Sequence, residues 1–278
     1  AMVAGFLVAA YLATLRARRE GIDPNAIWDI SMAVLFGGVI GARLFWVFQN
    51  SAEIFAPGRP AKVVLYDIVN LPNGGLVLYG GVMLGIVAYI WKCWQLKISS
   101  LRVADILISS IFVGEMFGRF GCFLNGCCYG DAVPDWTFPW AVQFPQGSPA
   151  YVSELHAGKI AESAKCSLPL LPTQIYSSIN ALFLAILTWC YYPYRSKNGE
   201  VLLLGWLLYP IARFCLEIVR DEPPGAFGTF LTIAQEISIY LFISGLGFAY
   251  YLSTQPRIPR PAKPVEENQP TDPAKNGL

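Results

Sequence analysis

The stretch GEMFGRFGCFLNGCCYG, residues 114–130, joins an apolar segment to a glycine- and cysteine-rich one. Glu115 and Arg119 are four residues apart, so on a helix they share one face and can pair. A charge at membrane depth costs roughly 2.5–3.5 kcal/mol on insertion scales, which makes Arg119 a candidate functional residue. We therefore expect a helix through Phe120 that emerges from an apolar environment and continues as a loop.

The composition indicates a membrane protein with several spans. Of 278 residues, 55% are hydrophobic and only 14% are charged, whereas a soluble domain carries about 25% charged residues. The formal net charge of +1 gives no reason to expect nucleic-acid binding. A single histidine, His156, excludes a histidine-rich metal centre. We expect no metal and no cofactor.

Apolar segments predict an all-α polytopic fold with about seven transmembrane helices in one domain, residues 1–254. The chain is expected to begin inside its first span, so that natural N-terminal sequence is missing. An outward-facing loop region is predicted at 121–171, and a disordered tail, rich in proline, lysine and glutamate, at 255–278. The predicted spans are 1–15, 30–48, 76–94, 103–120, 172–192, 201–219 and 230–252.

The distribution of basic residues predicts the orientation. One set of alternate connections, including the C-terminal tail, carries twelve lysines and arginines, and the other set carries five. Positive residues accumulate on the cytoplasmic side of a membrane. We therefore expect a multi-pass membrane protein with its C-terminus in the cytoplasm.

Three arginines, Arg43, Arg119 and Arg213, fall within predicted spans or at their outer ends. A guanidinium group presents a planar fork of donors that suits a phosphate. Inward-facing arginines in a membrane need anionic partners, which Glu115 and Glu217 can supply in part. Two interpretations follow: a structural Arg–Glu network that fixes the helices, or a site for a phospholipid headgroup.

Five pieces in order resemble the prolipoprotein diacylglyceryl transferase family, over nearly the whole chain from Gly5 to about Tyr250. The third piece looks like the family signature Gly-Arg-x-Gly-Asn-Phe-x-Asn-Gly-Glu-x-x-Gly, and the second like its Gly-Gly…His-Gly-Gly motif. The pieces are GARLFWVF at 41–48, GGLVLYGG at 74–81, GRFGCFLNGCCYG at 118–130, PTQIY at 172–176 and YPIARFCLEIVRDEP at 209–223.

The resemblance implies transfer of diacylglycerol from phosphatidylglycerol to the lipobox cysteine thiol of a prelipoprotein signal peptide, releasing glycerol 1-phosphate. It implies a location in the bacterial inner membrane, with membrane lipids as surroundings, and it requires no metal. It makes Arg119 and Arg213 the catalytic, lipid-handling residues, with Tyr79 in the place of the family's histidine. Phospholipid binding is further expected of Arg43, Asn125, Gly80 and Gly81, with Glu115, Glu217 and Tyr209 in support.

Three positions depart from the family pattern. Tyr79 replaces a histidine, and a tyrosine with a reference pKa of about 10 is a poorer base near neutral pH. Cys122 and Cys127 replace a polar asparagine and glutamate. The departures favour a rival interpretation, a non-catalytic paralogue that binds a phospholipid or a lipoprotein.

The outer cysteines, Cys122, Cys127, Cys128 and Cys166, leave three alternatives open. They can form a disulfide or pack as small thiols that order the loop, since an oxidising compartment permits disulfides. They can instead act as reactive thiols of a membrane thiol-redox protein. A metal site is the third alternative, although CxxxxCC lacks the usual paired spacing.

Gly80 and Gly81 also have two explanations. Glycines let neighbouring helices pack closely, without any functional role. Backbone amides at an entry loop can instead meet a phosphate, and the motif at 74–81 favours this explanation for these two residues.

Overall fold

The computed structural model describes residues 1–70, 74–133, 139–220, 225 and 229–258. Within them the chain is helical, and the extended pairings are isolated bridges such as Ala132 with Leu170. The long helices are α1 (Met2–Arg19), α2 (Pro24–Gln49), α5 (Leu78–Gln95), α6 (Ser100–Asn125), α8 (Thr173–Tyr191), α9 (Glu200–Glu217) and α10 (Ile233–Ser253).

Each predicted span corresponds to one of these seven helices, which confirms the helical fold. Four of them, α2, α6, α8 and α10, are long and apolar enough to cross a membrane. The other three have 18 residues each. Charged residues lower the apolar character of α1, which carries three arginines, and of α9, which carries Arg213 and two glutamates.

One predicted helix end was wrong. α6 continues beyond Phe120 to Asn125, where Gly126 adopts the left-handed conformation, with φ of 71°, that ends many helices. The connection 49–75, between the predicted spans 30–48 and 76–94, holds two short helices that the sequence did not predict, α3 (Ser51–Ile54) and α4 (Ala61–Val69). The loop region likewise holds α7 (Pro149–His156), whose first turn is capped by Ser148.

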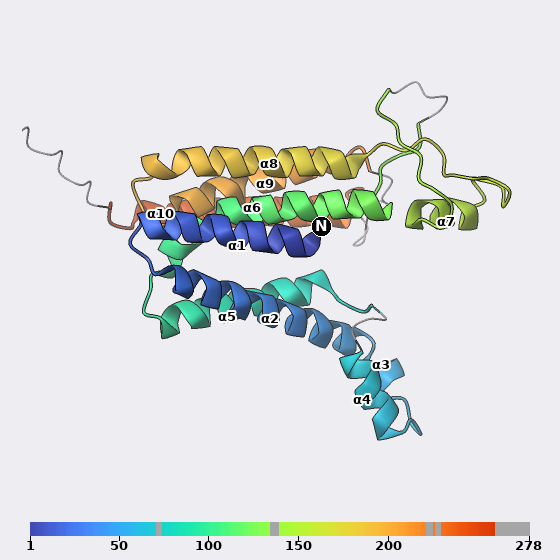
Figure 1. Cartoon of the computed structure of the whole chain (residues 1–278), viewed down its shortest axis with the longest axis horizontal. Helices are drawn as coiled ribbons and strands as arrows, with labels where there is room; N and C mark the ends of the chain where they lie inside the picture. The colour runs from blue at the N-terminus through green and yellow to red at the C-terminus, as the bar shows by residue number, and fades with distance from the viewer. Residues whose placement is uncertain (71–73, 134–138, 221–224, 226–228, 259–278) are drawn as a thin grey trace, which may run out of the picture.

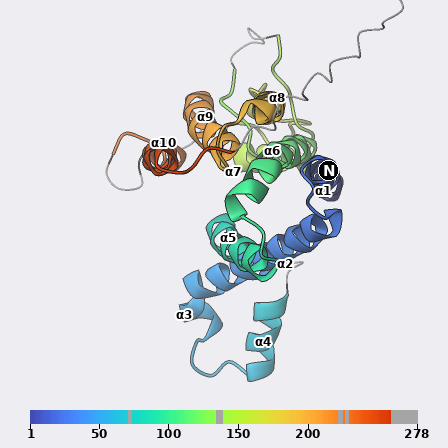
Figure 2. The ribbon, with the colours of Figure 1, turned by 90° about the vertical axis from the view of Figure 1, so that its left-hand side faces the viewer.

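The helices run side by side along the length of the molecule (Figure 1). α2 packs mainly on α5, α6 on α8 and α1, and α10 on α9. In the end-on view, α6 lies between the α2–α5 pair and the group formed by α8, α9 and α10 (Figure 2). α6, which carries the stretch 114–125, is therefore central to the bundle.

The main core lies at one end of the bundle, where α1 meets α2 and α8 meets α9. It joins the end of α1 to the start of α2 through Ala13, Ala17 and Ile27. The starts of α6 and α9 enter it through Val103 and Val201. The opposite end carries the loop region, with a smaller core of Phe144, Ala150 and Leu170. The predicted site residues lie towards this second, less densely packed end.

Most of the predicted disordered tail, 259–278, lies outside the described residues. Just before it, the amide of Ile258 donates to the carbonyl of Ser196 at 2.7 Å.

Candidate active site

Arg119 and Glu115 lie on one face of α6, as their spacing predicts. Arg119 Nε is 3.8 Å from Glu115 Oε1, and both side chains are about a quarter exposed, at 24%. The separation exceeds hydrogen-bond length, so the pair is held by charge alone. The Tyr209 hydroxyl, from α9, interacts with both side chains. The positive charge of Arg213 also attracts the Glu115 carboxylate. Glu115 therefore interacts with both Arg119 and Arg213.

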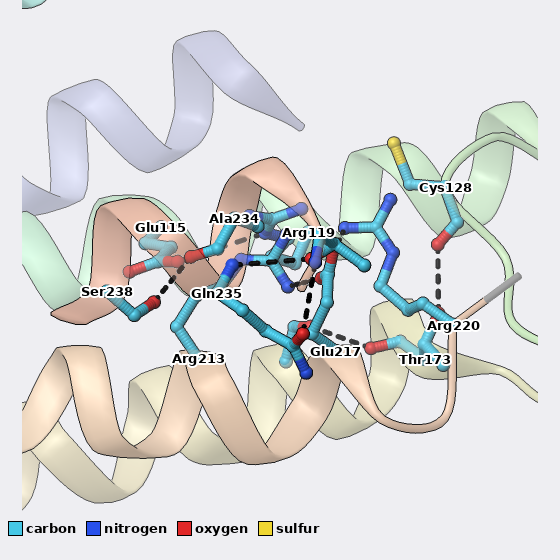
Figure 3. A network of polar contacts seen from close by, with 12 residues as sticks. Glu115, Arg119, Cys128, Thr173, Arg213, Glu217, Arg220, Ala234, Gln235 and Ser238 are labelled. Carbon is cyan, nitrogen blue, oxygen red and sulfur yellow. Dashed lines mark hydrogen bonds and ion pairs between the residues drawn. The ribbon is translucent and has the colours of Figure 1, made fainter. Parts of the chain in front are cut away.

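Glu217 is the buried centre of a second group of contacts (Figure 3). Its side chain is 2% exposed and pairs with Arg213, one turn earlier on α9. Arg220 Nη1 is 3.7 Å from the same carboxylate oxygen, Oε2. The other oxygen accepts a hydrogen bond of 3.0 Å from Thr232 Oγ1. Glu217 thereby holds two arginines and the start of α10 together.

The start of α10 makes this geometry rigid. Thr232 is its N-cap, and it forms a capping box with Gln235 in which each side chain bonds to the other residue's backbone. The same Thr232 hydroxyl that caps the helix therefore also fixes the Glu217 carboxylate. Figure 3 shows the side chains of Arg119, Arg213 and Arg220 gathered around this carboxylate.

The cysteine loop lies beside the arginines. The sulfurs of Cys122, Cys127 and Cys128 all lie within 4.8 Å of one another. Two buried side chains of α8 hold the loop: Thr173 Oγ1 donates to the Cys128 carbonyl at 2.9 Å, and Gln174 Nε2 donates to the Cys127 carbonyl at 2.7 Å. The PTQIY motif therefore fixes the backbone of the cysteine loop.

All seven cysteines fall within the described residues, and all are free thiols. The disulfide alternative is therefore absent from this structure, whereas packed thiols are present. Burial, followed by the neighbouring Cys127, raises the pKa of the Cys128 thiol above its usual range. An isolated thiolate is not favoured there, which weakens the reactive-thiol alternative. Cys166 is separate, in an isolated bridge with Pro145.

Arg43 belongs to a different group of contacts. All five of its N–H donors bond to backbone carbonyls. Four of these bonds, to Ile68, Asn70, Gly74 and Gly75, are 2.7–2.9 Å long, and the fifth is to Asp67. Its guanidinium also lies over the Trp46 ring. These contacts favour a structural role, in which Arg43 holds the segment between α4 and α5, over phosphate binding.

Gly80 and Gly81 lie in the first turns of α5, against α2. A Cβ on Gly80 would be 2.3 Å from Phe45 Cβ and 2.4 Å from the Gly41 carbonyl oxygen. The Gly81 amide donates within its own helix, to the Val77 carbonyl at 3.3 Å. Close helix packing therefore accounts for both glycines.

Tyr79 and Asn125 are outside the arginine group. Tyr79 is 50% exposed in the first turn of α5. Asn125 is exposed at the last position of α6. The structure thus gathers Arg119, Arg213, Glu115, Glu217 and Tyr209, with the cysteine loop beside them. The predicted residues that lie elsewhere are Arg43, Tyr79, Gly80, Gly81, Asn125 and Cys166.

Sequence reasoning missed Arg220, Thr232, Thr173 and Gln174 as parts of the site. Arg220 falls in the quoted piece 209–223, but no role was predicted for it. Its spacing of three residues from Glu217 was an available signal, because i, i+3 pairs share a helix face. Thr232 and Gln235 have the spacing of a capping box, which was a second signal.

These features define an integral membrane protein of the α-helical class with an ionic site at one end of its bundle. The family model described as prolipoprotein diacylglyceryl transferase matches residues 1–251. The chain therefore belongs to that family, which confirms the resemblance seen in the motifs.

Curated relatives carry the same name. A phosphatidylglycerol–prolipoprotein diacylglyceryl transferase of Clostridium tetani is 30% identical, over 88% of this chain and 89% of its own. A second transferase of that name, from Clostridium perfringens, is 26% identical over 87% of this chain and 85% of its own. A protein of Rhodopirellula baltica with this name is 36% identical over 54% of this chain and 30% of its own.

Proposed function

We propose that this chain transfers diacylglycerol from phosphatidylglycerol to the lipobox cysteine thiol of prelipoproteins and releases glycerol 1-phosphate. One observation supports this best: Arg119 is short of acceptors within the described part of the chain. Glu217 pairs with Arg213 and Arg220, which leaves Glu115 as the carboxylate that faces Arg119. Arg119 approaches its carboxylate only to 3.8 Å, and a guanidinium has five donors to fill.

The unfilled donors suit a phosphate diester. In the proposed reaction the acceptor thiol attacks a glycerol carbon, and the bond from that carbon to the phosphate oxygen breaks. Negative charge then grows on the leaving phosphate, and fixed cations stabilise such charge most effectively in a site with little water. Arg119 and Arg213 are proposed to bind that phosphate. Glu115, Glu217 and Tyr209 are proposed to orient them.

The remaining sequence-based roles are proposed in a weaker form. Tyr79, half-exposed, suits hydrogen bonding better than proton abstraction, because its reference pKa is about 10. Asn125, exposed beside the cysteine loop, is retained as a contact for the lipid headgroup or the signal peptide. The contacts of Arg43 and of Gly80 and Gly81 support structural roles instead.

We propose that all seven long helices cross the bacterial inner membrane. The lysine and arginine distribution supports a cytoplasmic C-terminus and an outward-facing loop region 126–171. The ionic site then lies near the outer surface, at the depth of phospholipid headgroups, where a secreted signal peptide presents its cysteine.

The test is transfer to a synthetic lipobox peptide in nanodiscs that contain phosphatidylglycerol, read by mass spectrometry. Arg119→Gln and Arg213→Gln should each slow transfer by about 10²–10³-fold, the usual loss when one group that stabilises developing charge is removed. Arg18→Gln is the control, because Arg18 is exposed at the far end of α1. Unchanged transfer by Arg119→Gln would overturn the assignment. Phosphatidylglycerol binding without any transfer by the unmodified chain would favour the non-catalytic paralogue.

A further inference from the structure

Three sulfurs in the described part of the chain are close enough to hold one metal ion. Cys122 is in the last turn of α6, and Cys127 and Cys128 follow Gly126. Their sulfurs lie within 4.8 Å of one another. Four-coordinate zinc binds thiolates at about 2.3 Å, which separates the sulfurs by about 3.8 Å. Side-chain rotations that move each sulfur by roughly 0.6 Å would therefore close the site.

The backbone around the sulfurs is fixed before any ligand binds. Thr173 and Gln174, which anchor the Cys128 and Cys127 carbonyls, are each 1% exposed. The Cys127 amide donates to the Cys122 carbonyl at 3.1 Å. Cys128 has a φ of 60°, a left-handed conformation that L-residues rarely adopt. Such strain is held only where the surroundings enforce it, and it is concentrated at functional sites.

The charges around the sulfurs favour an anionic centre. The positive charge of Arg119 favours negative charge on the sulfurs of Cys122 and Cys128, and that of Arg220 favours it on Cys128. Figure 3 shows Cys128 next to Arg119 and Arg220. A zinc ion with three thiolates has one net negative charge, and nearby guanidinium groups stabilise it.

We propose that Cys122, Cys127 and Cys128 bind a Zn²⁺ ion whose fourth position takes the acceptor thiol of the transfer reaction. The inference rests on the function proposed above. Zinc sites with three protein ligands keep their fourth position open for water or substrate. Thiolates are soft ligands that select zinc over magnesium or calcium. A metal site is the third of the alternatives that the sequence leaves open for these cysteines.

The zinc supplies the activation that the chain otherwise lacks. A thiol that coordinates zinc is deprotonated outright, so the acceptor loses its proton to water on binding. Its sulfur then forms a bond to the glycerol carbon, the carbon–oxygen bond to phosphate breaks, and the electron pair stays on the phosphate oxygen. The positive charge of the proton that the thiol releases balances the one negative charge that the phosphate gains when it becomes glycerol phosphate. Neither a histidine nor Tyr79 is then needed as a base.

The first experiment measures metal content in the full chain, purified in detergent under reducing conditions. We expect one zinc ion per chain, and its loss in the triple variant Cys122→Ser, Cys127→Ser, Cys128→Ser. Cys190→Ser is the matched control, since Cys190 is an exposed thiol of α8. No zinc, zinc retained by the triple variant, copper(I) in its place, or a disulfide among these cysteines would each overturn the proposal.

The second experiment replaces zinc with Co²⁺, whose visible spectrum reports its ligands. Adding a lipobox peptide should change the cobalt bands and strengthen the thiolate charge-transfer band, whereas the Cys→Ser peptide should not. If the cobalt spectrum does not change when the cysteine-containing peptide is added, the proposal that the metal binds the acceptor thiol is refuted. This measurement needs no mutation of the site and no turnover.

The third experiment separates this inference from the proposed function. Chelation should abolish transfer by the unmodified chain, and Zn²⁺ but not Mg²⁺ should restore it. Full transfer by metal-free protein would overturn the zinc inference and leave the transferase function standing. Zinc binding with the cobalt response, but no transfer from phosphatidylglycerol under any condition, would refute the function and support the metal site.

Discussion

Replacing Glu217 with glutamine removes the charge that two arginines share without changing the size of the side chain. Arg213 pairs with this carboxylate, and Arg220 approaches it to 3.7 Å. At an effective dielectric constant of 20, a pair at that distance is worth about 4.5 kcal/mol before desolvation is subtracted. Removing one partner of a buried pair costs roughly 3–5 kcal/mol, because the other charge stays buried.

The loss should appear in both stability and rate. Glutamine keeps an oxygen that can accept from Thr232, so the cap of α10 survives and the lost charge is isolated. If about 3 kcal/mol of the effect reaches the transition state, transfer slows by about 10²-fold. Nanodisc transfer assays and thermal unfolding in detergent measure the two effects on the same preparations.

A double variant separates the two effects. Arg213→Gln with Glu217→Gln removes both charges of the closest pair, so the unfolding temperature should recover towards the unmodified value. Transfer should not recover, because Arg213 is proposed to bind phosphate. Glu236→Gln, the same chemical change one turn into α10, is the control and should keep both properties. Normal transfer and an unchanged unfolding temperature in Glu217→Gln would refute the reasoning.

Three further variants test structural roles by unfolding in detergent. Arg43→Gln should lower the free energy of unfolding by at least about 2 kcal/mol, because hydrogen bonds to charged groups are worth about 1.5–3 kcal/mol each. It should also make residues 55–70 accessible to proteolysis, and unchanged resistance to protease would contradict this. Gly80→Ala should cost about 1–3 kcal/mol by separating α2 from α5, whereas Gly247→Ala, in open space, should not; equal costs would refute the packing argument. Asp105→Asn should lower the free energy of unfolding by about 1–3 kcal/mol. The fully buried Asp105 carboxylate accepts hydrogen bonds from the backbone N–H groups of Gly199 and Leu202, one on each oxygen, and an asparagine side chain has only one oxygen. Transfer per folded molecule should be unchanged.

Contacts within one helix could be predicted from the sequence, and contacts between helices could not. The spacing of Glu115 with Arg119 is enough to identify their shared face, and Arg213 with Glu217 has the same spacing. The bond from Thr232 to Glu217 joins different helices. The bonds from Thr173 and Gln174 to the cysteine loop span 45 and 47 residues. Only the resemblance to the family had indicated that 172–176 matter.

The connection 49–75 shows why a short helix was missed. Pro60 and Gly58 indicate a turn, and α4 has only nine residues, none of them buried. Short helices draw little stability from their own sequence. The carbonyls that bind Arg43 belong to the last turn of α4 and to the segment that follows it. Backbone carbonyls have no sequence signature, so the feature that organises this segment is invisible in the sequence.

The same limit explains why three arginines looked equivalent and are not. Sequence assigned Arg43, Arg119 and Arg213 one role because each is a charge in an apolar segment. The structure fills all five donors of Arg43 with carbonyls. Arg119, by contrast, has one carboxylate within ion-pair range among the described residues. This is Glu115, whose Oε1 lies 3.8 Å from Arg119 Nε.

An arginine whose donors are already filled cannot add a phosphate without breaking existing bonds, whereas an under-filled one gains by doing so. The degree to which an arginine's donors are already used, and not its depth in the membrane, is therefore what separates a structural cation from Arg119.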